Sequence, residues 1–322
     1  MQEKLIARAK ELLAEGKVQK VIGWSKGLFD EDITPAVFSS AEELDKGFVF
    51  NKYCKANLSK YLVKITREIE VKKSTTRMNN TMAKQRDPNA VDAPIPSEVV
   101  LVFLKPSDTY SFTQLLKENR ITRGDVYAIG IPCQDTLDGS DVCDSCKGKK
   151  HVSCDELIGV DAAAEENLTP NTERMEMVAK VEAMTDEERF EFWRGEMSRC
   201  IRCNACRNVC PACTCEKCVF DNNALYTTQK VAETNFEENL FHIIRAWHVA
   251  GRCTDCGECS RGCPQHIPLY LLNRKFIKDI NEIYGNYQAG ADMESKPAML
   301  RYEENDPETT IVYDRSNNGG EK

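Results

Sequence analysis

The apolar residues of the N-terminal half follow two different periods. A helical period predicts helices at residues 3–16, 56–70 and 111–119, the first of them ended by Gly16 as a C-cap. Short apolar runs predict strands at residues 20–24, 37–38, 48–50, 99–104 and 126–131. Because a strand, a helix and a strand follow one another over residues 99–131, we expect a βαβ unit in a parallel sheet. The pattern therefore predicts an α/β domain over residues 1–160.

Residues 73–98 break this pattern. They contain Asn79, Asn80 and three prolines, and they have few large apolar side chains. Asparagine and proline favour turns, and a segment with little apolar surface has little to bury. We therefore expect an insertion at residues 73–98 that forms a loop or is partly disordered.

The C-terminal half begins with a charged, helical pattern. Residues 161–198 are predicted to form a helical connector, in which Thr185 and Glu188 make a capping-box pattern at the start of its last helix. The apolar stripe of residues 268–284 predicts another amphipathic helix. Residues 285–322 are polar and acidic, which predicts an extended or disordered tail.

Length and charge narrow the classes of function. The chain has 322 residues, 41% of them hydrophobic, which is enough for about two domains with packed cores. The formal net charge of −8 argues against a nucleic-acid-binding surface, which needs a basic face. No run of about 18 apolar residues is present, so we expect no membrane span. The charged N-terminus lacks the apolar run of a signal peptide, and we therefore expect a cytoplasmic protein.

Cysteines are the most informative residues of the sequence. There are sixteen, and fifteen of them lie between Cys133 and Cys263, mostly two or three residues apart. In the cytosol thiols stay reduced, and cysteines so close together are poor disulfide partners but good ligands of one shared centre. The clustering therefore indicates metal centres.

Two cysteine runs have the spacing of a bacterial-type dicluster ferredoxin. They read Cys200-x2-Cys203-x2-Cys206-x3-Cys210-Pro211 and Cys253-x2-Cys256-x2-Cys259-x3-Cys263-Pro264. In this spacing three thiolates surround one [4Fe–4S] cluster and the fourth cysteine ligates the other cluster. We therefore expect one cluster held by Cys200, Cys203, Cys206 and Cys263, and a second held by Cys253, Cys256, Cys259 and Cys210. The dicluster domain is predicted to span residues 199–284.

Arginines flank both runs, at positions 199, 202, 207, 252 and 261. They are interpreted either as charges that raise cluster potentials or dock an acidic partner, or as ordinary solvated surface charge.

The other eight cysteines form two further groups. Cys213-x-Cys215-x2-Cys218 offers three ligands, and Cys54 is assigned as the fourth by elimination. The second group consists of Cys133, Cys143, Cys146 and Cys154. Four groups of four cysteines predict two more [4Fe–4S] clusters, although exchanging Cys54 and Cys133 would satisfy the same count.

Zinc is an alternative for both of these groups, and the second group also offers a spacing typical of a zinc site. Cys143, Cys146, His151 and Cys154 have the spacing of a short zinc knuckle, which would leave Cys133 spare. The softness of four thiolate ligands and the neighbouring ferredoxin runs favour iron over zinc.

Other chemistry is not indicated by the sequence. His242, His248 and His266 are interpreted as packing or surface residues. There is no glycine-rich dinucleotide fingerprint, Walker loop, nucleophile elbow or zinc-protease motif. We therefore assign no catalytic residue.

The chain resembles formate dehydrogenase beta-type subunits, which belong with the beta subunits of deazaflavin-reducing hydrogenases. The segments that carry the resemblance are RCIRCNACRNVCPACTCEKC from Arg199, FHIIRAWHVAGRCTDCGECSRGCP from Phe241, and LLNRK from Leu271. Weaker similarity covers KVIGW, VFNKYC, LLKENRI and IGIPC in the N-terminal half. The resemblance implies an iron–sulfur subunit that relays electrons between a catalytic dehydrogenase or hydrogenase subunit and a heterodisulfide-reductase-like flavoprotein.

One departure from this family concerns flavin. The deazaflavin branch binds FAD in the N-terminal domain, and the family usually has Gly-Cys-Asp after the strand equivalent to residues 99–104. Here Lys105-Pro106-Ser107-Asp108 stands in that position. The loss of a small residue would hinder close approach of a cofactor to the backbone. An electron relay without flavin is therefore the main expectation. An FAD-containing oxidoreductase subunit acting on a deazaflavin or nicotinamide is the alternative function.

Overall fold

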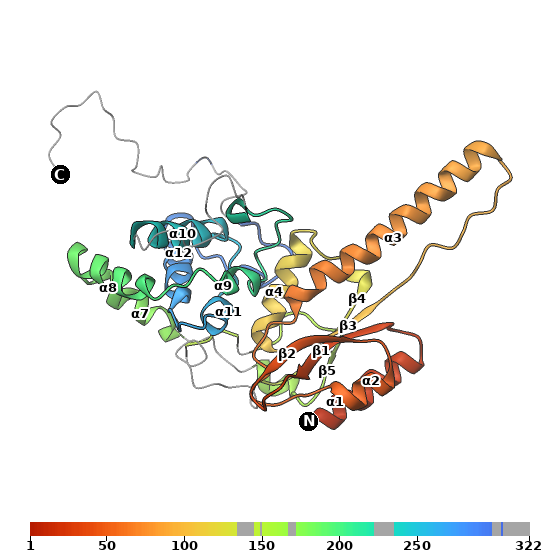
Figure 1. Ribbon diagram of the computed structural model, residues 1–322, viewed down its shortest axis with the longest axis horizontal. Coiled ribbons are helices and arrows are strands. Elements are labelled where there is room, and N and C mark those ends of the chain that lie inside the picture. Colours follow the sequence, from red (N-terminus) through yellow and green to blue (C-terminus); the bar gives the residue numbers. More distant parts are fainter. Residues whose placement is uncertain (134–144, 149, 167–171, 222–234, 298–303, 305–322) are drawn as a thin grey trace.

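The N-terminal domain is built on a mixed five-stranded sheet. The computed structural model describes residues 1–133, 145–148, 150–166, 172–221, 235–297 and 304 (Figure 1). The strand order is β2-β1-β3-β4-β5, with bounds β1 Lys20–Lys26, β2 Ile33–Phe38, β3 Val100–Leu104, β4 Val126–Gly130 and β5 Glu156–Leu157. Only β1 and β2 pair antiparallel, and the other neighbours are parallel. The predicted α/β class and βαβ unit are therefore confirmed.

Helices cover the sheet and bury its apolar residues. Their bounds are α1 Gln2–Ala14, α2 Ala41–Gly47, α3 Ser59–Arg86, α4 Pro106–Lys117 and the 3-10 turn η1 Arg123–Asp125. Every residue of β3 is buried, as expected for a central parallel strand packed on both faces. The predicted C-cap is confirmed, since Gly16 has φ of +70° and Lys17 N donates to Leu12 O at 3.0 Å. The predicted strand at 48–50 is reduced to a single bridge between Phe48 and Ser25.

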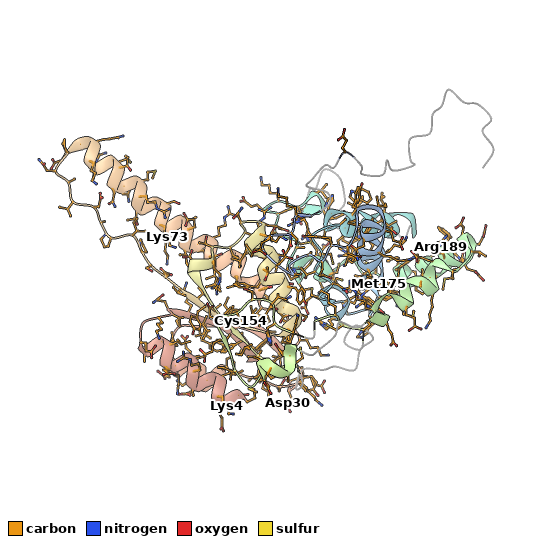
Figure 2. All side chains as sticks on the ribbon, turned by 180° about the vertical axis from the view of Figure 1, so that it is seen from behind. Lys4, Asp30, Lys73, Cys154, Met175 and Arg189 are labelled. Carbon is orange, nitrogen blue, oxygen red and sulfur yellow. The ribbon has the colours of Figure 1, made fainter. Side chains whose placement is uncertain are left out.

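The expected loop at residues 73–98 is wrong for its first half. Helix α3 continues without a break to Arg86 and projects from the body of the molecule (Figure 1). Its outer part is rich in good helix formers, and the first proline comes only after it ends. The Thr76 and Thr81 hydroxyls bond to carbonyls four residues earlier, which satisfies them within the helix. Lys73, labelled in Figure 2, pairs with Asp125.

The C-terminal half is helical. The bounds are α6 Ala162–Glu166, α7 Glu176–Glu182, α8 Asp186–Ser198, α9 Ala205–Asn208, α10 Asn235–His248, α11 Glu258–Arg261 and α12 Leu269–Tyr284, with 3-10 turns η3 Thr172–Met175 and η4 Val219–Asp221. The predicted capping box is confirmed, because Glu188 N donates to Thr185 Oγ1 and Thr185 N donates to the Glu188 carboxylate. The predicted helix at 268–284 is confirmed as α12.

The chain after α12 does not extend away at once. Gly290 has φ of +73°, and its Cα lies so close to Tyr110 that a Cβ would come within 1.9 Å of the Tyr110 carbonyl oxygen. Lys117 Nζ donates to Ser295 Oγ at 3.1 Å, which ties the same segment to α4. The predicted tail is therefore wrong for residues 285–297, and nearly all of its remainder lies outside the described residues. Within the described part of the chain, no helix is long and apolar enough to cross a membrane.

Candidate metal centre

The two ferredoxin-type loops have the same backbone conformation. Arg202 and Asn204 of the first loop have φ of +54° and +61°, and Asp255 and Gly257 at the equivalent positions of the second have +54° and +74°. Left-handed residues at these places turn the backbone tightly between the cysteines. A short helix, α9 or α11, begins after each second left-handed residue. The local sequence spacing thus produces two matching cysteine cradles.

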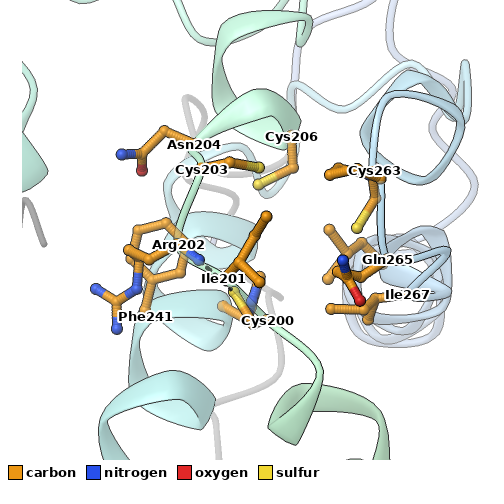
Figure 3. Close-up of a pocket in the computed structure, with 13 residues that line it drawn as sticks. Cys200, Ile201, Arg202, Cys203, Asn204, Cys206, Phe241, Cys263, Gln265 and Ile267 are labelled. Atoms are coloured by element: carbon orange, nitrogen blue, oxygen red, sulfur yellow. Dashed lines mark hydrogen bonds between the residues drawn. The ribbon is translucent and has the colours of Figure 1, made fainter. Parts of the chain in front are cut away.

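Cysteine pocket one is formed by Cys200, Cys203, Cys206 and Cys263 together with Phe241 and Ile267. Figure 3 shows Cys203 and Cys206 of one loop facing Cys263, which comes from the other run. These are the four cysteines predicted to ligate one cluster. Cys203 is exposed and Ile201 is 55% exposed, so pocket one lies next to the molecular surface.

Cysteine pocket two is formed by Cys210, Cys253, Cys256 and Cys259 with Tyr270 and Asn273. Here too the fourth cysteine comes from the other run, as the crossed arrangement requires. Three of the four cysteines are buried and Cys253 is partly buried. Pocket one also has three buried cysteines, so the two pockets differ in the fourth cysteine, which is exposed Cys203 in pocket one and partly buried Cys253 in pocket two.

The donor set of both pockets fits a [4Fe–4S] cluster. Each pocket offers four thiols, and backbone N–H groups point at sulfur: Arg202 N to Cys200 Sγ at 3.3 Å, and Asp255 N to Cys253 Sγ at 3.4 Å. In pocket two, Asn273 Nδ2 also donates to Cys259 Sγ at 3.3 Å. Such bonds to sulfur are the usual means by which proteins adjust cluster potentials.

Burial raises the pKa of one thiol in each pocket to a similar value. The pKa of Cys206 and that of Cys253 rise to about 12, chiefly because a thiolate is costly to bury. A thiolate ligand at these positions therefore needs a neighbouring positive charge, which an iron–sulfur core supplies. None of the fifteen cysteines within the described ranges forms a disulfide.

Pocket two is fixed to the α/β domain by hydrogen bonds. Asn57 N donates to Glu258 Oε2 at 3.1 Å, and the Ser111 and Thr254 hydroxyls lie 2.8 Å apart. Buried Lys147 donates to the Thr254 carbonyl. The second loop therefore lies between the two halves of the chain.

A buried ion pair supports the same loop. Arg274 of α12 donates from Nε to Asp255 Oδ1 at 2.8 Å, and both side chains are 1% exposed. Arg274 also donates to Ser145 Oγ at 2.7 Å. This pair holds the left-handed turn at Asp255 against α12.

Four of the flanking arginines are placed by specific partners. Arg199 pairs with Glu196, Arg207 with Asp221, Arg252 with Glu118 and Arg261 with Glu258. The Arg202 guanidinium lies 4.2 Å from the Phe241 ring centroid. Purely solvated surface charge is therefore the wrong interpretation for Arg252 and Arg261, whose side chains are mostly buried.

Sequence reasoning missed a buried arginine between the two pockets. Arg245 is 1% exposed, and its three side-chain nitrogens have no hydrogen-bond partner among the described residues. The signal was present, because Arg245 follows Phe241 by one helical turn and so lies on the buried face of α10.

The histidines have the predicted packing or surface positions, with His242 buried and His248 and His266 exposed. His242 is buried next to Phe241, and burial followed by repulsion from Arg245 lowers its pKa to about 3, so the ring is neutral at pH 7. His248 lies 6.4 Å from the Phe220 ring.

The Cys213, Cys215 and Cys218 group lies beside the base of α3. Lys60 Nζ donates to the Cys213 carbonyl. The thiols of Cys210, Cys213 and Cys215 all act on the pKa of Lys60, which burial lowers. This places the group next to pocket two.

The second extra group is brought together only in part. Cys143 lies outside the described residues. Burial raises the pKa of Cys133 to about 12, and Cys146 is among the groups near enough to act on this pKa electrostatically. The pKa of Cys154 is raised chiefly by burial, and its N–H donor is Gly130.

His151 is not directed at these cysteines. Its Nδ1 lies 2.9 Å from Glu165 Oε1, and its Nε2 lies 3.2 Å from the carbonyl oxygens of Leu104 and Ile131. Both ring nitrogens therefore have oxygen partners, which does not favour the zinc alternative that uses this histidine.

Cys54 is fully buried near the start of α3. Its thiol accepts from Asn51 N at 3.3 Å, and burial raises its pKa to about 11. The charged group that acts on this pKa is Lys105, which also acts on Cys133. Cys54 and Cys133 therefore both lie near Lys105, and the pairing of Cys54 with Cys213, Cys215 and Cys218 stays a prediction.

The altered turn after β3 does not fit a flavin approaching the backbone. A Cβ on Gly148 would lie 2.6 Å from Ser107 Cα, so the segment around Gly148 covers the start of α4. Lys105 Nζ donates to the carbonyls of Cys54 and Lys55 at 3.0 and 2.7 Å. The space at this turn is therefore filled by the chain itself.

Comparisons with known proteins place the iron–sulfur domain. Residues 196–267 match the 4Fe-4S dicluster domain family. An F420-dependent formate dehydrogenase subunit beta of Methanocaldococcus jannaschii is 33% identical over 115 residues, or 35% of this chain and 29% of that relative. An F420-dependent formate dehydrogenase 1 subunit beta of Methanococcus maripaludis is 31% identical over 144 residues, or 40% of this chain and 36% of the relative.

These matches confirm the dicluster domain and the resemblance to formate dehydrogenase beta-type subunits. The chain spans about a third of the length of the curated relatives that it matches. The C-terminal half is thus an iron–sulfur domain joined to an α/β domain.

Proposed function

We propose that this protein is the electron-transfer subunit of a multi-subunit oxidoreductase, with one [4Fe–4S] cluster in each cysteine pocket. The observation that carries the proposal is the crossed arrangement of eight cysteines in two adjoining pockets, one of them next to the surface. A cluster bound in each pocket would take up and release single electrons. The chain itself would contribute no bond-making chemistry.

The residues around the two pockets would have different roles in electron transfer. Exposed Cys203 and Ile201 give pocket one a face that a redox partner can approach. The hydrogen bonds from Asn57 and Ser111 hold pocket two against the α/β domain. We infer that one partner docks over pocket one and that the α/β domain faces the other.

Two further [4Fe–4S] clusters would extend the path. Lys60, which contacts Cys213 and whose pKa is influenced by Cys210, supports a position near pocket two for one centre. Lys147, which follows Cys146 and donates to the Thr254 carbonyl, supports a position near the same pocket for the other. With all sixteen cysteines used as ligands, the chain would carry about sixteen irons. An iron count near eight, with one or two zincs, would reject the two extra clusters and leave the dicluster domain untouched.

The partners are proposed from the relatives. Both relatives are named as formate dehydrogenase beta subunits, so a formate dehydrogenase-like catalytic subunit is the expected donor or acceptor. A hydrogenase subunit in that role, and a heterodisulfide-reductase-like flavoprotein at the other end, remain part of the proposal. We propose a cytoplasmic location for the complex.

The isolated chain tests this function. After anaerobic purification it should be reduced by dithionite, with the absorption near 400 nm bleached, yet it should not turn over formate, hydrogen, nicotinamide or deazaflavin. Activity should appear only when the co-purifying subunits are added. Stoichiometric flavin released by acid, together with turnover of nicotinamide or deazaflavin by the chain alone, would establish the alternative FAD-containing oxidoreductase instead.

A further inference from the structure

Arg245 is a buried cation whose nitrogens have no protein acceptor within the described ranges. Its side chain is 1% exposed, and Nε and both terminal nitrogens are without a hydrogen bond there. Burying a guanidinium without a partner costs several kcal/mol, so native structures retain such a group only when an anion satisfies it. The other large buried arginine, Arg274, follows this rule through Asp255 and Ser145.

The neighbours of Arg245 are sulfur atoms from both pockets. Burial alone would lower the pKa of Arg245, whereas Cys259, Cys206, Cys210 and Cys213 raise it when they are ionised, as cluster ligation requires. Cys206 belongs to pocket one, whereas Cys210 and Cys259 belong to pocket two. Along α10 and the residue that follows it, Arg245 comes one turn after Phe241, which lines pocket one, and one turn before Val249, whose carbonyl accepts from Cys253 N of pocket two at 2.8 Å. Buried Arg245 therefore lies between the two pockets.

Helix α10 fixes this position. Phe241, one turn earlier, lines pocket one and packs on Phe220 with ring centroids 4.5 Å apart. Ala246 and Val249 are buried beside it. His242 does not satisfy Arg245, because an imidazole carries no negative charge and both of its ring nitrogens lack a hydrogen-bond partner among the described residues.

We propose that Arg245 is the shared counter-ion of the two clusters, donating hydrogen bonds to sulfur on both sides and raising both reduction potentials. This rests on the occupancy of the pockets proposed above. A cluster with four thiolates carries net negative charge that grows by one on reduction, so a fixed cation between two clusters favours the reduced state of each. The effect of Arg245 is electrostatic, and it takes part in no bond-making step.

The test compares three variants of the full chain, purified anaerobically with their iron counted. Arg245→Gln removes the charge, Arg245→Lys keeps it, and Arg199→Gln removes a charge beside Cys200 from a side chain that is 46% exposed. The reduction potentials of the clusters in each variant are measured by EPR-monitored redox titration. At a fixed solution potential, Arg245→Gln should lower the ratio of reduced to oxidised cluster at least tenfold, or about 59 mV for a one-electron couple.

The controls separate charge from packing. Arg245→Lys should recover most of the wild-type potential, and Arg199→Gln should change the ratio less than twofold because water screens its charge. Wild-type potentials in iron-loaded Arg245→Gln would overturn the counter-ion role. An absence of iron from the wild-type protein would instead refute the clusters themselves.

If Arg245→Gln and Arg245→Lys both fail to bind iron, the structure of the wild-type holoprotein tests the proposal instead. Its structure should place guanidinium nitrogens within about 3.6 Å of sulfur in both pockets, slightly longer than an ordinary hydrogen bond. A guanidinium bonded to a carboxylate or carbonyl instead would overturn the proposal.

Discussion

The two cysteine pockets have the same local backbone and different surroundings. Both loops turn through left-handed residues at equivalent positions, and both are followed by a single helical turn. Pocket one, however, has an exposed cysteine at its rim, whereas the loop of pocket two is bonded to Asn57, Ser111 and Arg274. Cysteine spacing therefore determines the backbone conformation of each loop. Distant parts of the chain determine how far a bound cluster is exposed to solvent and to partner proteins.

The largest expected difference comes from removing one ligand on each side. Cys256→Ala and Cys203→Ala should each lose about four irons, because each removes a ligand of one cubane. Only Cys256→Ala should also loosen the contact between the two halves of the chain, because Cys256 lies between Thr254 and Glu258, which bond to Ser111 and Asn57. Iron analysis and limited proteolysis check this prediction. Equal protease sensitivity of the two variants would contradict the difference between the pockets.

The buried ion pair beside pocket two should cost more to break than an exposed pair beside pocket one. Arg274→Met removes the closer of the two arginines that face buried Asp255 among the described residues and leaves Arg174, at 3.6 Å, which should lower the free energy of unfolding by about 3 kcal/mol. Arg199→Gln breaks the exposed pair with Glu196 and should cost about 0–1 kcal/mol. Anaerobic urea unfolding measures both. A loss below about 1 kcal/mol for Arg274→Met would show that the Asp255 turn does not depend on α12.

A single hydrogen bond should distinguish the potentials of the two clusters. Asn273→Ala removes the N–H donated to Cys259 Sγ, so one cluster should become harder to reduce, by a few-fold in the reduced-to-oxidised ratio. The other cluster should titrate as in the wild type. Gln265→Ala, which changes the lining of pocket one, is the matched control for EPR titration. Equal shifts of both clusters in Asn273→Ala would mean that Asn273 acts through general polarity.

The smallest expected effect concerns the helix that leads into pocket one. Thr185→Ala removes the N-cap of α8, which ends just before Cys200, and should cost about 1 kcal/mol of stability. Ser40→Ala removes the comparable cap of α2, far from either pocket. Thermal melting should show similar losses for the two variants, and only Thr185→Ala should speed the loss of iron to a chelator. Identical iron loss would indicate that α8 does not support pocket one.

The sequence was sufficient for the features that depend on local pattern. The capping box at Thr185, the C-cap at Gly16 and the two ferredoxin-type runs depend on residues a few positions apart, and the structure agrees with them. The outer half of α3 differs from the loop that its asparagines and the later prolines predict. The helix formers in this segment outweigh the asparagines, and the prolines come only after the helix has ended.

The environment of the site could not be predicted in the same way. Arg245 acts on cysteines up to thirty-nine positions away, and the hydrogen bond between Asn57 and Glu258 joins residues 201 positions apart. Such contacts depend on how the two halves pack, which no local pattern encodes. The flanking arginines adjoin the cysteine motifs, whereas Arg245 lies apart from them in the sequence. Its place on the apolar face of a helix is unusual for a charged side chain.

Anomalous diffraction at the iron edge tests the crossed arrangement most directly. Crystals of anaerobic holoprotein should show two four-iron clusters in the dicluster domain, one within bonding distance of Cys200, Cys203, Cys206 and Cys263, and the other of Cys210, Cys253, Cys256 and Cys259. Iron bonded to Cys210 together with Cys200, Cys203 and Cys206, or a single metal ion in either pocket, would contradict the account.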